Sequence, residues 1–296
     1  MFIECADGVQ LACTLTVPAT SANSTTSTAP TTFATPTVRT TPRYVVINSA
    51  TGVRRSFYGA FALHLAEAGF HVLTWDPRSI GDSRKGHAKS DPARMRDWGM
   101  LDMDAVLLHT CALAAGDWSR IAVIGHSSGG HLSGLAASLA HVKQLALVAS
   151  GTCDWRLYPK RHLPRLLTAW YGLAPVVLTA LGYVPERLGV GHDLPPGVGW
   201  DWRNWSAAPG YLFSDPSLDL SGYRAFKGDL LALHFSDDTG FAPPATVTDL
   251  LRHFPNAHTE RIEFNPGTQS HRPVGHFGFF SAKNADLWPM VRKWLG

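Results

Sequence analysis

The run Gly125-His126-Ser127-Ser128-Gly129-Gly130 places a serine at the centre of a GxSxG pattern. The apolar run Ile121 to Ile124 just before it is expected to be a strand, and a helix is expected just after it. A serine in such a turn needs strained backbone angles, and glycines must flank it because side chains there would collide with neighbouring backbone. This context predicts Ser127 as a nucleophile and the backbone amide of Ser128 as a donor to an oxyanion.

A serine hydroxyl is a poor nucleophile at neutral pH, so a base must lie within hydrogen-bond reach and a third group must orient that base. Two adjacent carboxylates, Asp237 and Asp238, follow the apolar strand Leu231 to Phe235, and either could be the third group. His276, flanked by Gly275 and later by Gly278, is the predicted base because the glycines suggest backbone fitted closely into a site. His271, five residues earlier, is the alternative.

A second oxyanion donor is expected in the loop Asn48 to Val53, which follows the first strand predicted to be parallel. Its residues are small enough to let the backbone approach a substrate oxygen. We predict that the backbone amide of Thr51 is this donor.

The elements that must position these residues follow from hydrophobic periodicity. Short apolar runs alternate with helix-length amphipathic segments, which predicts the α/β fold class, with a mostly parallel central sheet and helices on both faces. These segments are Tyr44 to Asn48, Phe57 to Ala68, His71 to Asp76, Asp102 to Ala115, Ile121 to Gly125, Ser128 to Ala140, Gln144 to Ala149, Leu230 to Phe235, Ala245 to His253, Arg261 to Phe264 and Asn284 to Leu295.

Between residues 152 and 223 this alternation stops, and aromatic residues, Gly and Pro become frequent. We therefore expect residues 1–151 and 224–296 to form the two parts of one core, and residues 152–223 to form an inserted, mainly helical cap or lid. Residues 2–17 alternate around Asp7-Gly8, which favours a hairpin with a type I′ turn. Residues 18–42 are nearly all Ser, Thr, Ala and Pro and are expected to form a flexible surface loop, a glycosylated stalk being the alternative.

The chain resembles the α/β-hydrolase superfamily over about residues 43–296, and most closely a group of bacterial predicted α/β-hydrolases or esterases. The resemblance implies the α/β-hydrolase fold and a triad of Ser127, Asp238 and His276. Asp238 is preferred to Asp237 because related hydrolases often carry the acid at the fourth position of a GxxD turn, and residues 235–238 fit that register, with Phe235 in place of the Gly. Two further features depart from the pattern: Asn48-Ser49 stands where many members have His-Gly, and the insertion at residues 18–42 has no counterpart. The segments that carry the resemblance are Ala50 to Val53, Asp76 to Ser83, Asp97 to Gly99, Gly125 to Gly130, Phe235 to Asp238 and Gly275 to Phe280.

Composition narrows the classes of partner. The net charge of +3 over 296 residues is too small to favour nucleic acid or an anionic membrane, so a small-molecule substrate is expected. No apolar run reaches the roughly 20 residues of a membrane span.

The four cysteines form no CxxC pair and the histidines form no HExxH pattern, so we predict neither a metal nor a cofactor. The N-terminal residues lack the basic and apolar regions of a signal peptide, which predicts a cytoplasmic location. No feature of the sequence indicates an oligomeric state.

Together these features predict a serine hydrolase, and in particular a carboxylic ester hydrolase that acts on a small apolar ester through an acyl-enzyme. An acyltransferase, a thioesterase or a peptidase would use the same triad and stays an alternative. A catalytically silent α/β-hydrolase-fold binding module is the alternative of another class.

Overall fold

The chain begins with an antiparallel hairpin, as predicted. In the computed structural model, which describes residues 1–19 and 41–296, strand β1 (Phe2–Glu4) pairs with β2 (Gln10–Thr16). The turn is not of type I′, because a type I′ turn needs a positive φ at both central residues and only Gly8 of the Asp7-Gly8 pair has one. The amide of Gly8 donates to the carbonyl of Cys5, which makes a longer turn. Most of the Ser/Thr/Pro-rich stretch 18–42 lies outside the described residues.

One eight-stranded sheet contains both hairpin strands, in the order β1-β2-β4-β3-β5-β6-β7-β8. Strand β2 pairs antiparallel with β4, and every pair from β4 to β8 is parallel. Parallel strands end at the same edge of the sheet, so loops far apart in the sequence meet there. The parallel strands are β3 (Arg43–Asn48), β4 (Phe70–Trp75), β5 (Ile121–His126), β6 (Gln144–Val148), β7 (Asp229–Phe235) and β8 (His258–Phe264).

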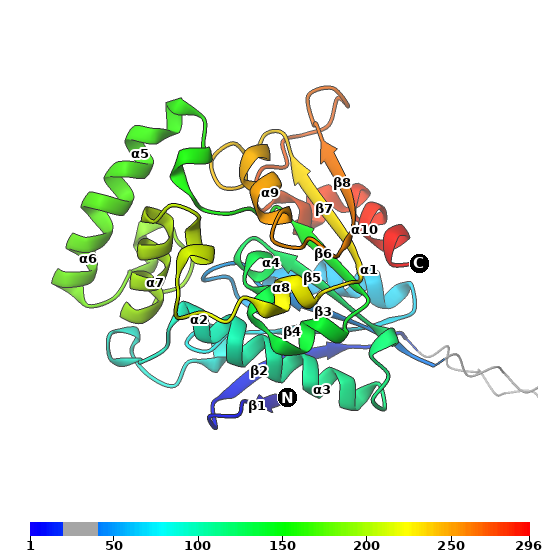
Figure 1. The fold of residues 1–296 in the computed structure, drawn as a ribbon. Coiled ribbons are helices and arrows are strands. Elements are labelled where there is room, and N and C mark those ends of the chain that lie inside the picture. Colours follow the sequence, from blue (N-terminus) through cyan, green and yellow to red (C-terminus); the bar gives the residue numbers. More distant parts are fainter. Residues whose placement is uncertain (20–40) are drawn as a thin grey trace, which may run out of the picture.

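Helices cover both faces of this sheet, which confirms the predicted α/β architecture (Figure 1). Alternate residues of a strand point to opposite faces, and accordingly Val45 belongs to one hydrophobic cluster and Val46 to the other. The Val45 cluster includes side chains of α1 and α10, and the Val46 cluster includes side chains of α3, α8 and α9. The short α2 (Met95–Asp97) leads through a π-helical stretch, Trp98–Met103, into α3. The helices that cover the sheet are α1 (Gly59–Glu67), α3 (Asp104–Leu113), α8 (Ser221–Ala225), α9 (Pro244–Leu251) and α10 (Trp288–Leu295).

The helix after Ser127 is shorter than predicted. Helix α4 spans Ser128–His131 and gives way to two 3-10 turns, Ser133–Leu135 and Ala137–His141. Glycines lower helix propensity here, and the hydroxyl of Ser133 bonds back to the carbonyl of Gly129 at 2.6 Å. Apolar residues keep a helical spacing as far as Ala140, but the backbone is α-helical only as far as His131.

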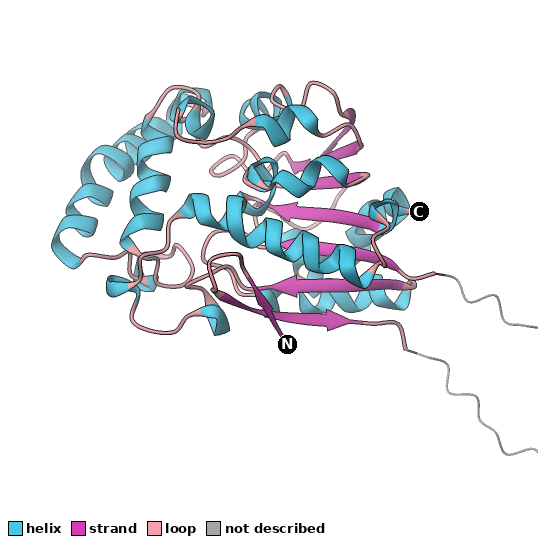
Figure 2. Cartoon of the chain, turned by 60° about the horizontal axis from the view of Figure 1, so that its bottom comes forward, coloured by secondary structure: helices cyan, strands magenta, loops and turns pink. Residues whose placement is uncertain are grey.

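Residues 152–223 contribute no strand to the sheet. They form α5 (Leu163–Leu167), α6 (Ala174–Leu181) and α7 (Pro196–Ala207), with α8 at their end, and a single isolated bridge joins Val184 to Leu194. In Figure 2 the parallel strands run toward the side of the molecule on which the larger of these helices lie. We call residues 152–223 the helical segment.

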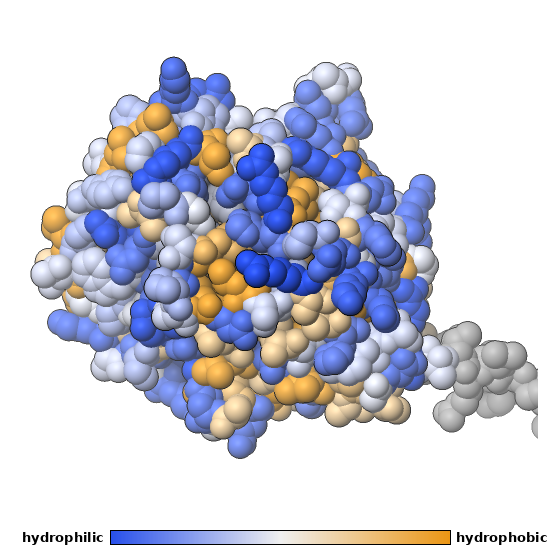
Figure 3. All heavy atoms as spheres, viewed as in Figure 1, coloured by the Kyte–Doolittle hydropathy of each residue, from blue (hydrophilic) through white to orange (hydrophobic). Residues whose placement is uncertain are grey.

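Most of the face shown in Figure 3 is hydrophilic, and apolar groups are exposed there in separate places. Within residues 1–19 and 41–296, no helix is long and apolar enough to cross a lipid bilayer.

Candidate active site

Ser127 lies at a sharp turn between β5 and α4. Its backbone has φ 52° and ψ −117°, a conformation that residues with a side chain rarely adopt and that tends to persist at functional sites. A Cβ atom added to Gly125 would overlap the backbone of Gly130, and one added to Gly129 would overlap the carbonyl of Asn48. The glycines of the GxSxG run therefore allow the close packing that the turn requires.

The imidazole of His276 lies between the Ser127 hydroxyl and the Asp238 carboxylate. Nε2 of His276 is 2.8 Å from Ser127 Oγ, and Nδ1 is 2.6 Å from Asp238 Oδ2. A carboxylate can only accept, so Nδ1–H donates to Asp238, which leaves Nε2 unprotonated and able to accept the serine proton. Asp238 and His276 are buried. This arrangement can remove a proton from Ser127 and hold the resulting imidazolium beside a carboxylate.

The neighbouring carboxylate makes different contacts. Asp237 Oδ2 accepts the backbone amides of Val274 and Gly275, at 2.8 and 3.0 Å. Asp237 therefore fastens the loop that carries His276, although it does not contact the imidazole. The alternative histidine, His271, has its Nε2 2.9 Å from Asp286 and takes no part in this cluster.

Behind the serine, a buried hydrogen-bond network joins the loop after β3 to the loop of His276. The amide of Ala50 donates to Tyr58 Oη at 2.9 Å, and Tyr58 Oη lies 2.8 Å from His126 Nδ1. His126 Nε2 lies 2.9 Å from the carbonyl of His276. A carbonyl can only accept, so Nε2 carries the proton and the tyrosine hydroxyl donates to Nδ1.

His126 stays neutral in this network because burial lowers its pKa to about 3, with a further lowering from the nearby His276. The sequence pointed to the motif that contains His126 but not to this role. Its partner Tyr58 lies 68 residues away, and no local pattern distinguishes Tyr58 from an ordinary aromatic residue before a helix.

The loop predicted to supply the second oxyanion amide lies beside the serine turn. The register pairs Asn48 with Gly125, which places the loop after β3 at the same sheet edge as Ser127. Ala50 already uses its amide on Tyr58. Among the described residues, no hydrogen-bond acceptor is found for the amide of Thr51. The Ser128 amide begins α4, where the first N–H groups of a helix have no partner within the helix.

The helical segment contacts these loops directly. The carbonyl of Gly52, which has φ 68°, accepts the amide of His192 at 2.9 Å. Tyr158 Oη donates to the carbonyl of Phe241 at 2.6 Å, three residues beyond Asp238. Tyr211 Oη lies 3.1 Å from Nε2 of the buried His131 in α4. The helical segment is thus attached to the loop after β3, to the loop after β7 and to the helix after Ser127.

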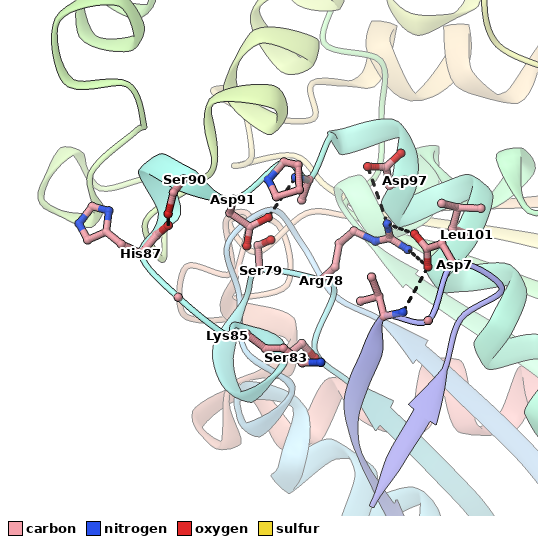
Figure 4. A pocket seen from close by; sticks show the side chains of 15 residues that line it. Asp7, Arg78, Ser79, Ser83, Lys85, His87, Ser90, Asp91, Asp97 and Leu101 are labelled. Carbon is pink, nitrogen blue, oxygen red and sulfur yellow. Dashed lines mark hydrogen bonds and ion pairs between the residues drawn. The ribbon is translucent and has the colours of Figure 1, made fainter.

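A surface cavity of about 620 Å³ lies apart from this cluster, between the N-terminal hairpin turn and the chain after β4 (Figure 4). Its buried Arg78 donates to Asp7 and, through Nε, to Asp102 at 2.7 Å. None of Ser127, Asp238 and His276 lines it. Asp7 and Asp102 pair with the guanidinium of Arg78, so the positive charge of Arg78 stabilises the packing of the hairpin turn against the chain after β4.

Comparisons with known proteins agree with this architecture. Residues 44–180 match the family model described as the alpha/beta hydrolase fold. No curated protein matches the chain at a significant level. Among solved structures, an α/β hydrolase from Sphaerobacter thermophilus is 16% identical with a TM-score of 0.56, over 100% of both chains.

Two esterases have similar structures. The esterase from Exiguobacterium antarcticum is 15% identical with a TM-score of 0.57, over 100% of this chain and 98% of its own. A thermophilic esterase from Thermogutta terrifontis, with malate bound, is 16% identical with a TM-score of 0.57, over 100% of this chain and 97% of its own. The strand order, the family match over residues 44–180 and this structural likeness show that the chain has the α/β-hydrolase fold.

Proposed function

We propose that the protein is a carboxylic ester hydrolase that uses Ser127 as nucleophile, His276 as general base and acid, and Asp238 as the group that orients His276. The observation that carries the proposal is the continuous line of hydrogen bonds from Ser127 Oγ through the imidazole to Asp238, at 2.8 and 2.6 Å. A binding module would have no need for a strained serine aligned with a buried base and acid.

In the proposed reaction, Ser127 Oγ attacks the ester carbonyl carbon and its proton passes to His276 Nε2. The backbone amides of Ser128 and Thr51 donate to the oxyanion of the tetrahedral intermediate. His276 returns the proton to the oxygen of the leaving alcohol as the carbon–oxygen bond breaks. A water molecule, activated by His276 in the same way, then releases the acid from Ser127.

We also propose that the helical segment acts as a cap on this site. It lies on the side of the molecule toward which the parallel strands run (Figure 2), and it contacts the loops after β3 and β7. Ester hydrolysis is preferred over acyl transfer, thioester cleavage and peptide cleavage because two structures with a similar fold are esterases. All of these reactions would use the same triad.

The test combines fluorophosphonate labelling with hydrolysis of p-nitrophenyl acetate, in the wild type and in Ser127→Ala. Ser90→Ala, which removes an exposed serine hydroxyl elsewhere, is the matched control. We expect labelling and hydrolysis in the wild type and in Ser90→Ala. In Ser127→Ala we expect no labelling and a rate lower by about 10³-fold or more, because the triad acts as a unit. A wild type that neither reacts with the probe nor cleaves esters would favour the silent binding module.

A further inference from the structure

Two exposed phenylalanines, Phe241 and Phe277, pack against the imidazole of His276, and a third, Phe57, packs against Phe277. The reaction proposed above gives none of the three a role. Phe57, Phe241 and Phe277 are 37%, 45% and 42% exposed. They come from three separate segments: the 3-10 turn Arg55–Tyr58 before α1, the loop after β7, and the residue after His276. We call these three side chains the aromatic rim.

The rings of the aromatic rim are contiguous with each other and with the imidazole. The ring of Phe241 stacks on that of His276, with centroids 4.6 Å apart and planes 25° apart. The ring of Phe277 meets the imidazole edge-on at 4.9 Å. Phe277 also lies 6.1 Å from Phe241 and 6.4 Å from Phe57, so it joins the other two.

Packing of the protein core does not account for this exposure. In the same short run, Phe279 and Phe280 are 0% and 1% exposed and belong to the core on one face of the sheet. Phe277 instead leaves much of its ring in solvent beside the imidazole. Clustered, exposed apolar side chains on a protein surface commonly mark a ligand site.

The backbone around the rim is held in place before any ligand arrives. Phe241 has its carbonyl bonded to Tyr158 and its amide bonded to Asp238 Oδ1, at 2.6 and 3.2 Å. Asp237 fastens the two residues that precede His276. A subsite that is already ordered loses less conformational entropy when a ligand binds.

The proposed chemistry determines which half of an ester would meet the rim. His276 Nε2 gives its proton to the leaving alcohol, so the alcohol oxygen must come within hydrogen-bond distance of Nε2. The group attached to that oxygen then lies against the imidazole and the rings packed on it. The acyl half is bonded to Ser127 and has its oxygen directed toward the amides of Ser128 and Thr51.

We propose that the aromatic rim is the leaving-group subsite, and that it selects esters whose alcohol half carries a neutral aromatic ring, such as benzyl esters. This inference depends on the proposed function, because it assigns sides of the substrate from the roles of Ser127 and His276. A neutral ring is favoured because the three rim side chains offer only apolar and aromatic contacts. In the step concerned, the bond between the acyl carbon and the benzyl oxygen breaks, and benzyl alcohol leaves with the proton from His276.

The test uses benzyl, cyclohexylmethyl and ethyl acetate, which share one acyl group and have alcohols of similar acidity. Ethyl phenylacetate and ethyl acetate form a second pair, in which the ring is moved to the acyl half. The variants are Phe241→Ala and Phe277→Ala, and Phe2→Ala, on the edge strand β1, is the matched control for loss of an exposed ring. The readout is the ratio of kcat/KM values within each pair, because a general change in the chemistry cancels in a ratio.

We expect the wild type to prefer benzyl to ethyl acetate by about tenfold or more, and to prefer benzyl to cyclohexylmethyl acetate. Each rim variant should lower the benzyl-to-ethyl ratio by about fivefold, the scale of one lost aromatic contact. Phe2→Ala should keep the wild-type ratio.

Three results would overturn the inference. The benzyl-to-ethyl ratio could stay constant in both rim variants, or only the phenylacetate ratio could fall, which would move the rim to the acyl side. A uniform loss on all esters would make Phe241 and Phe277 residues that position His276. Failure of the proposed function looks different, because Ser127→Ala would then keep the wild-type rates.

Discussion

Replacing Asp238 by asparagine should nearly abolish activity while leaving the fold intact, and the hydrogen bonds around this residue explain why. Oδ2 of Asp238 accepts the proton of His276 Nδ1, and Oδ1 accepts the backbone amide of Phe241 at 3.2 Å. The amide of Phe241 can only donate, so the side-chain oxygen of an asparagine is drawn toward it. The asparagine NH₂ group then faces His276 Nδ1 and donates to it.

This reversal places the wrong tautomer in the site. With Nδ1 acting as an acceptor, the imidazole proton moves to Nε2, which can no longer take the proton of Ser127. In serine proteases the corresponding substitution lowers kcat by about 10⁴-fold, which is about 5 kcal/mol of transition-state stabilisation. We expect a loss of that order for Asp238→Asn, with a melting temperature within a few degrees of the wild type.

Asp237→Asn is the matched control, because it makes the same chemical change one residue away. Oδ2 of Asp237 accepts the amides of Val274 and Gly275, and an asparagine oxygen can accept both. Only the charge is lost, so we expect a cost of about 1 kcal/mol in unfolding free energy and retention of most of the activity.

The assay is the kcat for p-nitrophenyl acetate at neutral pH, together with thermal unfolding followed by circular dichroism. A large rate loss in Asp237→Asn with an active Asp238→Asn would refute the reasoning and move the triad acid to Asp237. Comparable losses of kcat in both variants would show that holding the loop of His276 in place matters as much for the rate as fixing the tautomer of His276.

Two further predictions concern the buried groups behind the site. Tyr58→Phe should lower the free energy of unfolding measured in urea by about 2 kcal/mol, because it leaves the Ala50 amide and His126 Nδ1 without their hydrogen-bond partner. A change below about 0.5 kcal/mol would contradict the proposed contribution of this network. Burial lowers the pKa of His126 and of His131 to about 3, whereas an unfolded histidine titrates near 6.5, so their contribution is intact above about pH 6.5 and is lost as the pH falls. Burial raises the pKa of Asp102 to about 6, which acts in the opposite direction between about pH 4 and 6. These three groups together should lower the free energy of unfolding by an amount on the order of 3 kcal/mol between pH 6.5 and 4.5. Urea titrations that give equal stabilities at the two pH values would rule this out.

Local patterns were sufficient to predict the architecture. The predicted runs lie within a few residues of β3 to β8. For β3 to β7 the reason is that a strand buried on both faces is apolar along most of its length, whereas the edge strand β8 is mostly exposed and only its last four residues were predicted. The GxSxG run predicted the sharp turn between strand and helix at Ser127, since the preceding strand and the flanking glycines can be recognised in the local sequence. The length of the helix after Ser127 and the type of the hairpin turn were predicted wrongly. In both cases the backbone conformation depends on hydrogen bonds that periodicity does not encode.

The contacts that distinguish similar residues could not be read from the sequence. Asp237 and Asp238 are adjacent and chemically identical, and only the path of the loop 37 and 38 residues later decides which one meets Val274 and which one meets His276. The network through Tyr58 and His126 spans three segments of the chain. Such choices depend on how segments that are far apart in the sequence pack against one another.

These contacts also divide the site into a fixed part and a variable part. The loop of His276 is held from two sides, by His126 through its carbonyl and by Asp237 through the amides before it. His126 is in turn linked through Tyr58 to the loop that contains Thr51. Because the groups proposed for the chemistry are fixed to one another within the core, side chains of the aromatic rim and the helical segment can change without moving them. Substrate preference should therefore change more readily than the reaction itself, since the rim contacts the imidazole only through exposed rings.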